Sequence, residues 1–110
     1  MRTPLIALLM SLTASLAMAE GGAPDEAKAM ELAKANGCLS CHAKAEKIVG
    51  PAYASIAEKY KGDGDAVASL MASVRNGSKG KWGRIPMPPH ASLAEDDLKT
   101  IVQWILTVKP

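Results

Sequence analysis

The stretch Cys38-Leu39-Ser40-Cys41-His42 decides how the rest of this 110-residue chain is interpreted. Two cysteines separated by two residues and followed at once by a histidine form the attachment motif of a c-type haem. Each thiol adds to one vinyl group of the porphyrin, and the spacing places both thiols on the same edge of the ring. The imidazole that follows then lies under the ring, where it can bind iron. The stretch therefore predicts one covalent haem c, with His42 as an axial ligand.

Three other interpretations of the two cysteines explain less. A redox dithiol of the thioredoxin type needs a preceding strand, and no strand pattern precedes Cys38. A zinc site would lack a second cysteine pair, and His90 is the only other histidine of the chain. A structural disulfide would suit an exported protein but leaves His42 without a role.

Residues 1–19 have the features of a secretory signal peptide. Arg2 gives the positive start, an apolar stretch follows, and Ala17-Met18-Ala19 offers small residues at the cleavage positions. Polar residues interrupt the apolar stretch, which is short for a membrane span of about 20 residues. We therefore expect cleavage before Glu20, export to a bacterial periplasm, and a mature domain of residues 20–110 without a membrane span.

The composition fits a small domain built around a cofactor. Phenylalanine is absent and aromatic residues make up 4% of the chain, so a buried haem would supply apolar bulk that so small a core lacks. The formal net charge is +2, and removal of Arg2 lowers it to +1. Two haem propionates would bring the charge near neutral or slightly negative. This argues against nucleic acid as a partner, because nucleic acid binding usually needs a strongly basic face.

Hydrophobic periodicity and helix-ending residues predict four helices and no strand. The helices are expected at residues 25–36, 52–60 and 66–76, and in a final segment that begins after Ser92. Asp25 suits the start of the first helix, Asp65 is a good N-cap for the third, and Ser92 forms a capping box with Glu95. The residues expected to face inward on the later helices are Tyr53, Ile56, Tyr60, Val67, Leu70, Met71, Val74, Leu98, Ile101, Val102 and Ile105, with Trp104 beside them.

The second axial ligand is expected on the irregular stretch of residues 78–91. Its prolines and glycines prevent regular structure, and a loop of this length in a small domain usually has a function. Met87 lies between prolines that hold the backbone extended, so its thioether is presented on a stiff strap. The methionines on the predicted helices, Met30 and Met71, are expected to fill gaps in the core. His90, just past the strap, is the alternative ligand and would give two imidazoles.

Several stretches of the sequence occur in a characteristic order. They are CLSCH (38–42), VGPAY (49–53), NGSKGKWG (76–83), IPMPP (85–89) and a terminal helix that carries Trp104. In this order they closely resemble the small bacterial class I cytochromes c of the cytochrome c-551 type, and they span nearly all of the mature chain. The haem motif is shared by many c-type cytochromes, whereas the Trp-Gly-x-Ile-Pro-Met-Pro-Pro run is far more specific. The resemblance implies an all-α fold of about four helices wrapped around one haem.

The resemblance also implies roles for individual residues. His42 and Met87 would be the axial ligands, and Cys38 and Cys41 would carry the haem. The carbonyl of Pro51 would accept a hydrogen bond from the other imidazole nitrogen and so orient the ring. The indole N–H of Trp82 would reach a haem propionate. The first and last helices would cross over one haem edge.

Two positions depart from the pattern of this family. A basic residue that can meet a propionate often stands where this chain has Ser73. Arg75 is two residues further on and, on a helix, would point elsewhere. An asparagine usually follows the strap where this chain has His90. Both differences touch groups that tune the iron potential.

These observations predict a monomeric electron carrier rather than an enzyme. The sequence offers no catalytic triad, no paired-carboxylate site and no phosphate loop, and the acidic run at 95–97 suits the first turn of a helix. The resemblance implies a quinol-oxidising cytochrome complex as donor and a haem nitrite reductase, terminal oxidase or photosynthetic reaction centre as acceptor. Docking should be weak and transient, at a small apolar patch that several cationic residues surround. The cationic residues near the cofactor-binding segments are Lys44, Lys47, Lys79, Lys81 and Arg84.

Two alternatives stay open from the sequence. In a haem-based sensor or peroxidase, Met87 would dissociate and iron would bind a small ligand such as carbon monoxide or peroxide. The domain could also be a fixed subunit of a larger oxidase. Finding the protein free in a periplasmic extract would argue against a fixed subunit of an oxidase.

Overall fold

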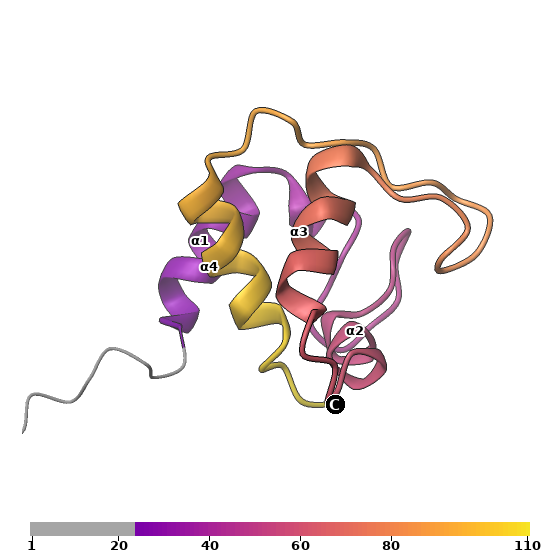
Figure 1. Cartoon of the computed structure of the whole chain (residues 1–110), viewed down its shortest axis with the longest axis horizontal. Coiled ribbons are helices and arrows are strands. Elements are labelled where there is room, and N and C mark those ends of the chain that lie inside the picture. The colour runs from indigo at the N-terminus through magenta and orange to yellow at the C-terminus, as the bar shows by residue number, and fades with distance from the viewer. Residues whose placement is uncertain (1–23) are drawn as a thin grey trace, which may run out of the picture.

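The computed structural model describes residues 24–110, and the signal peptide predicted at residues 1–19 lies outside them. The described chain forms helices α1 (Glu26–Ala35), α2 (Tyr53–Lys59), α3 (Ala66–Asn76) and α4 (Glu95–Ile105), with a 3-10 turn η1 (Cys38–Ser40) (Figure 1). No strand occurs among these residues, which confirms the all-α prediction. The first three helices begin and end within one residue of their predicted bounds. Within residues 24–110, no helix combines the length and the apolar character needed to cross a membrane.

Of the two aspartates predicted as N-caps, one makes a capping hydrogen bond and the other does not. The Asp25 carboxylate accepts a hydrogen bond from the Lys28 N–H at 3.3 Å, as an N-cap does. Asp65 occupies the N-cap position of α3, but its side chain makes no capping hydrogen bond. The local sequence signals therefore locate these helix starts better than they predict the capping contact itself.

The capping box predicted at Ser92 and Glu95 is wrong. Helix α4 begins at Glu95 with Ala94 as its N-cap and without a side-chain cap. The chain instead turns just before the helix, where the Leu93 N–H donates to the His90 carbonyl at 3.3 Å. This turn buries Leu93 in the core and leaves Ser92 exposed.

Helix α4 is the centre of the fold because it packs against each of the other three α-helices. The residues predicted for its inner side are all buried: Leu98, Ile101, Val102, Trp104 and Ile105. Figure 1 shows α1 and α4 side by side, with α3 on the other side of α4. On α1, Ala29 and Ala33 are fully buried, and their small side chains let the two helices approach closely.

The inner faces of α2 and α3 are less completely covered than that of α4. Ile56 and Leu70 are buried, whereas Tyr60 and Val74 are only partly buried. All four residues line a pocket that lies between these helices and α4. The inner faces of α2 and α3 are thus the predicted ones. They border a cavity in part, rather than packing entirely against another helix.

The connection from α3 to α4 folds back over the end of α3. Within it, Ser78 and Met87 form an isolated antiparallel bridge, in which the Ser78 N–H donates to the Met87 carbonyl (3.1 Å) and the Met87 N–H donates to the Ser78 carbonyl (2.8 Å). Figure 1 shows this connection as a long loop that extends past α3 and then returns toward α4. The absence of regular structure across residues 78–91 is as predicted.

Candidate haem site

One apolar pocket collects all the residues that the sequence predicted for the haem site. Cys38, Cys41, His42, Pro51, Trp82 and Met87 all belong to its lining. The remaining walls come mainly from the inner faces of α2, α3 and α4. The space amounts to about 1050 Å³, part of it open to solvent.

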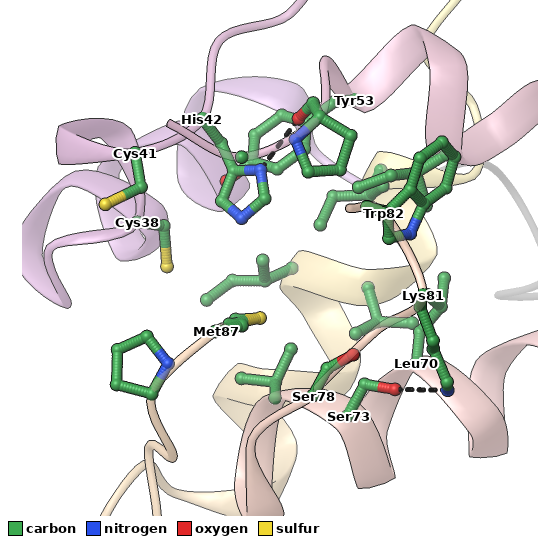
Figure 2. Close-up of a pocket in the computed structure, with 18 of the residues that line it drawn as sticks. Cys38, Cys41, His42, Tyr53, Leu70, Ser73, Ser78, Lys81, Trp82 and Met87 are labelled. Atoms are coloured by element: carbon green, nitrogen blue, oxygen red, sulfur yellow. Dashed lines mark hydrogen bonds between the residues drawn. The ribbon is translucent and has the colours of Figure 1, made fainter. Parts of the chain in front are cut away.

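The haem motif forms a tight turn at one end of the pocket. Both the Cys41 N–H (3.2 Å) and the His42 N–H (3.0 Å) donate hydrogen bonds to the Cys38 carbonyl. Figure 2 shows both sulfur atoms on the same side of the His42 imidazole. Cys38 is buried and Cys41 partly buried, and neither is in a disulfide. Burial raises the pKa of the Cys38 thiol, against a smaller lowering by hydrogen bonds from its surroundings.

His42 is held in a fixed orientation. Its Nδ1–H donates a hydrogen bond to the Pro51 carbonyl at 2.8 Å, and only 9% of the residue is exposed. The Tyr53 ring stacks on the imidazole with centroids 5.2 Å apart and an interplanar angle of 18°. Tyr53 in turn meets the edge of Trp104 on α4 at 5.4 Å. With Nδ1 engaged, Nε2 is the ring nitrogen left to face the pocket (Figure 2).

Gly50 is a site residue that the sequence did not reveal. A Cβ at this position would lie 2.6 Å from Cε1 and 2.9 Å from Nδ1 of His42. The Gly50 N–H donates to the Cys41 carbonyl at 2.7 Å, which brings this backbone against the imidazole. In the sequence, Gly50 stands only as part of the VGPAY stretch, which does not indicate a contact with the imidazole.

Met87 lines the pocket on the wall opposite His42, and Figure 2 shows its thioether directed into the space between them. Met30 and Met71 lie outside the lining and pack against the core, as predicted. His90 is not in the lining either, and its backbone N–H donates to a carbonyl of α3 at 2.8 Å. Within residues 24–110, Met87 is thus the one methionine or histidine that faces His42 across the pocket.

A glycine at the end of α3 allows the Met87 strap to come close. Gly77 has φ 83° and ψ 169°, a combination found essentially only in glycine. A Cβ there would lie 2.8 Å from the Met87 carbonyl oxygen and 3.2 Å from Pro89 N. Gly77 therefore sets how closely the segment around Met87 packs against the end of α3, a contact that the sequence did not predict.

The end of the pocket away from the cysteines carries polar groups. Trp82 is partly buried there, and Nζ of Lys59 lies 4.6 Å from the centroid of its ring, a cation–π contact. Lys81 Nζ donates a hydrogen bond to Ser73 Oγ at 2.9 Å. Arg75 is directed elsewhere, as predicted: its Nη1 lies 3.4 Å from carbonyl oxygens just before α4.

The arrangement fits a haem c. Two thiols lie at one edge, an imidazole and a thioether face each other from opposite walls, and apolar side chains fill the walls between them. These are the groups that attach, ligate and surround this cofactor. Among residues 24–110, no aspartate or glutamate lines the pocket, which suits a cofactor that brings carboxylates of its own.

Comparison with known proteins decides the family. The sequence profile of cytochrome c matches residues 26–109. The chain belongs to the cytochrome c family. It is 48% identical over 79 residues to cytochrome c-551 of Pseudomonas denitrificans, covering 72% of this chain and 95% of that protein. It is 41% identical over 103 residues to cytochrome c-551 of Pseudomonas aeruginosa, covering 94% of this chain and 96% of that protein.

A solved structure confirms the fold of this cytochrome c. The crystal structure of cytochrome c552 from Nitrosomonas europaea is similar with a TM-score of 0.71 and 45% sequence identity, covering 73% of this chain and 99% of that one. The protein therefore has the small all-α fold of a class I cytochrome c of the c-551 type, and its cofactor is a covalently bound haem c. The names of its relatives indicate electron transfer rather than enzymatic catalysis.

Proposed function

We propose that this cytochrome c is a soluble, monomeric electron carrier of a bacterial periplasm. Its haem would be attached through Cys38 and Cys41 and ligated by His42 and Met87. The observation that carries the proposal is that His42 and Met87 face each other across one pocket and that each is fixed by backbone contacts. When bound, haem supplies one-electron chemistry between ferrous and ferric iron.

The residues around the two ligands have distinct roles in this proposal. The Pro51 carbonyl keeps the His42 ring from rotating and makes its free nitrogen a better electron donor. The thioether of Met87 favours the ferrous state, so His/Met ligation raises the potential. Because both ligand positions are filled by side chains on rigid segments, the iron needs no substrate and little rearrangement when it changes charge.

The mouth of the pocket offers a surface for transient docking. Val49 and Ile85 line the pocket, yet they are 44% and 65% exposed. Ile48, next to Val49, is 52% exposed. We refer to Ile48, Val49 and Ile85 as the rim patch. A small apolar patch of this kind suits the weak, short-lived contacts of redox partners.

Of the five cationic residues predicted near the rim patch, two are engaged elsewhere in the fold. Lys44 pairs with Glu26 of α1 at 2.5 Å, and Lys81 donates to Ser73. Lys47, Lys79 and Arg84 are exposed on the two loops that carry the rim patch. They are the cations that we expect to attract an acidic partner.

The donor and acceptor follow from the family rather than from the pocket. We propose a quinol-oxidising cytochrome complex as donor and a haem nitrite reductase, a terminal oxidase or a photosynthetic reaction centre as acceptor. The predicted signal peptide at residues 1–19 and the likeness to bacterial cytochromes c-551 support export to the periplasm.

Carbon monoxide tests the proposal against a sensor or peroxidase, in which Met87 would dissociate. The purified holoprotein is reduced, exposed to carbon monoxide, and followed by its absorption spectrum. A carrier should show six-coordinate ferrous bands that carbon monoxide leaves unchanged, together with reversible one-electron oxidation. Rapid spectral change on addition of carbon monoxide would overturn the carrier proposal.

A further inference from the structure

Lys81 is the one charged side chain, among the residues that the structure describes, that lines the haem pocket. No arginine, aspartate or glutamate of the described part of the chain belongs to the lining. Haem c brings two carboxylates, its propionates, into this pocket. A carboxylate that is even partly removed from water needs a cation or hydrogen-bond donors nearby. The pocket thus provides one cationic group for a cofactor that carries two anionic ones.

We propose that Lys81, held on Ser73 by a hydrogen bond, binds a haem propionate. The loop of residues 78–91 then supplies the cation that α3 lacks at position 73. The proposal deepens the haem site described above and rests on haem being bound there. It adds Lys81 and Ser73 to the cofactor-binding residues, beside Trp82.

The hydrogen bonds around Ser73 position the Lys81 ammonium group and leave two of its three donors available for a propionate. The Ser73 hydroxyl donates to the Ser69 carbonyl at 3.1 Å, so its oxygen lone pairs are what the Lys81 ammonium meets at 2.9 Å. An ammonium group has three donors, and this contact uses one of them. The others remain for a carboxylate, and Ser73 fixes where the ammonium sits.

The position of Lys81 is also the correct one for a propionate. Figure 2 shows Lys81 and Trp82 at the end of the pocket away from Cys38 and Cys41. The vinyl groups that react with the cysteines lie on one half of the porphyrin, and the propionates lie on the other. A haem attached at the motif therefore directs its propionates toward Lys81 and the Trp82 indole.

The matched comparison is Lys81→Met against Lys79→Met. Methionine keeps most of the aliphatic stem and removes the charge, and Lys79 is an exposed lysine of the same loop that does not line the pocket. The midpoint potential of each holoprotein is measured in the same buffer at about pH 8, where carboxylates such as the haem propionates are ionised. Loss of a positive charge close to the haem favours the ferric state, so Lys81→Met should lower the potential clearly more than Lys79→Met.

Rescue variants test whether a cation at this end of the pocket accounts for the lower potential of Lys81→Met. Lys81→Arg should keep the wild-type potential. Adding Ser73→Lys to Lys81→Met should return the potential most of the way to the wild-type value, because the new lysine supplies a cation from α3. The visible spectrum of every variant should match that of wild type. An unchanged spectrum would show that the shift in potential does not come from a change of the axial ligands. Equal shifts for Lys81→Met and Lys79→Met, or no recovery with Ser73→Lys, would overturn the role of Lys81.

Discussion

His42 is positioned by three neighbours that the haem motif itself does not contain. Pro51 accepts its hydrogen bond, Tyr53 stacks on its ring, and Gly50 passes close to it. The sequence predicted the Pro51 contact only through family resemblance, and it predicted Tyr53 only as an inward-facing residue. Gly50 was not predicted at all, because its closeness to the imidazole depends on how the loop after the motif folds back.

Replacing Gly50 with Ala should therefore disturb His42, the proposed proximal ligand. The added Cβ would lie 2.6 Å from the ring, so either the imidazole or the backbone must shift. Overpacking of this kind costs about 1–3 kcal/mol. We expect the free energy of unfolding to fall by about that amount in chemical denaturation, with a change in the haem absorption spectrum.

Gly64→Ala is the control for this substitution. Gly64 is not among the glycines with positive φ, and a Cβ at its position would meet no atom within 4 Å. Its effect should stay within about 0.5 kcal/mol, as for an ordinary surface substitution. If Gly50→Ala were as harmless as Gly64→Ala, the close contact with His42 would not constrain the site.

The helices themselves follow from local sequence, and their connections do not. Periodic apolar residues located α2 and α3 and the buried face of α4 because each helix has one side against the core. The start of α4 was misjudged because burial of Leu93, a tertiary effect, outweighs the capping signal of Ser92. The proline strap was predicted as irregular, but its attachment to the end of α3 needed the structure.

Gly77→Ala tests whether that attachment holds Met87, the proposed distal ligand, in place. Alanine is strained at φ 83° and ψ 169°, and its Cβ would meet the Met87 carbonyl at 2.8 Å. Strain of this kind costs on the order of 1–3 kcal/mol. The Met-ligated spectrum should be lost at lower denaturant concentration than in wild type.

Gly62→Ala separates strain from contact with the strap. Gly62 also has a positive φ, 78°, but a Cβ there meets nothing within 4 Å. Gly62→Ala should lower overall stability without weakening Met87 ligation selectively. Equal effects of both substitutions on the Met-ligated spectrum would show that Gly77 matters only through its backbone conformation.

Taken as a whole, the molecule places the opening of its haem pocket between two loops that also carry exposed cations. The sequence predicted a ring of cations around the haem edge, and the structure reduces that set to Lys47, Lys79 and Arg84, because Lys44 and Lys81 have partners within the fold. Which surface lysines are free is a property of the folded molecule and could not be predicted from spacing.

Electron transfer to a small anionic oxidant measures the effect of these cations. With ferricyanide as the probe, oxidation of the reduced protein should slow as ionic strength rises, because screening weakens attraction at the pocket mouth. Lys79→Glu should slow the reaction at low salt. Lys109→Glu makes the same charge change at a residue that lines a separate hollow, with Trp104, and should have a smaller effect. A flat salt dependence, or equal rates for both variants, would remove the steering role.

The central claim, an electron carrier with His42 and Met87 on opposite sides of the iron, is tested most directly by Met87→Ala. The variant should keep its covalent haem, because Cys38 and Cys41 are unchanged, and its midpoint potential should fall because the thioether no longer favours ferrous iron. Its reduced form should now bind carbon monoxide. Met30→Ala, a methionine outside the pocket, should retain the wild-type spectrum and potential. A Met87→Ala protein with the spectrum and potential of wild type would contradict the account.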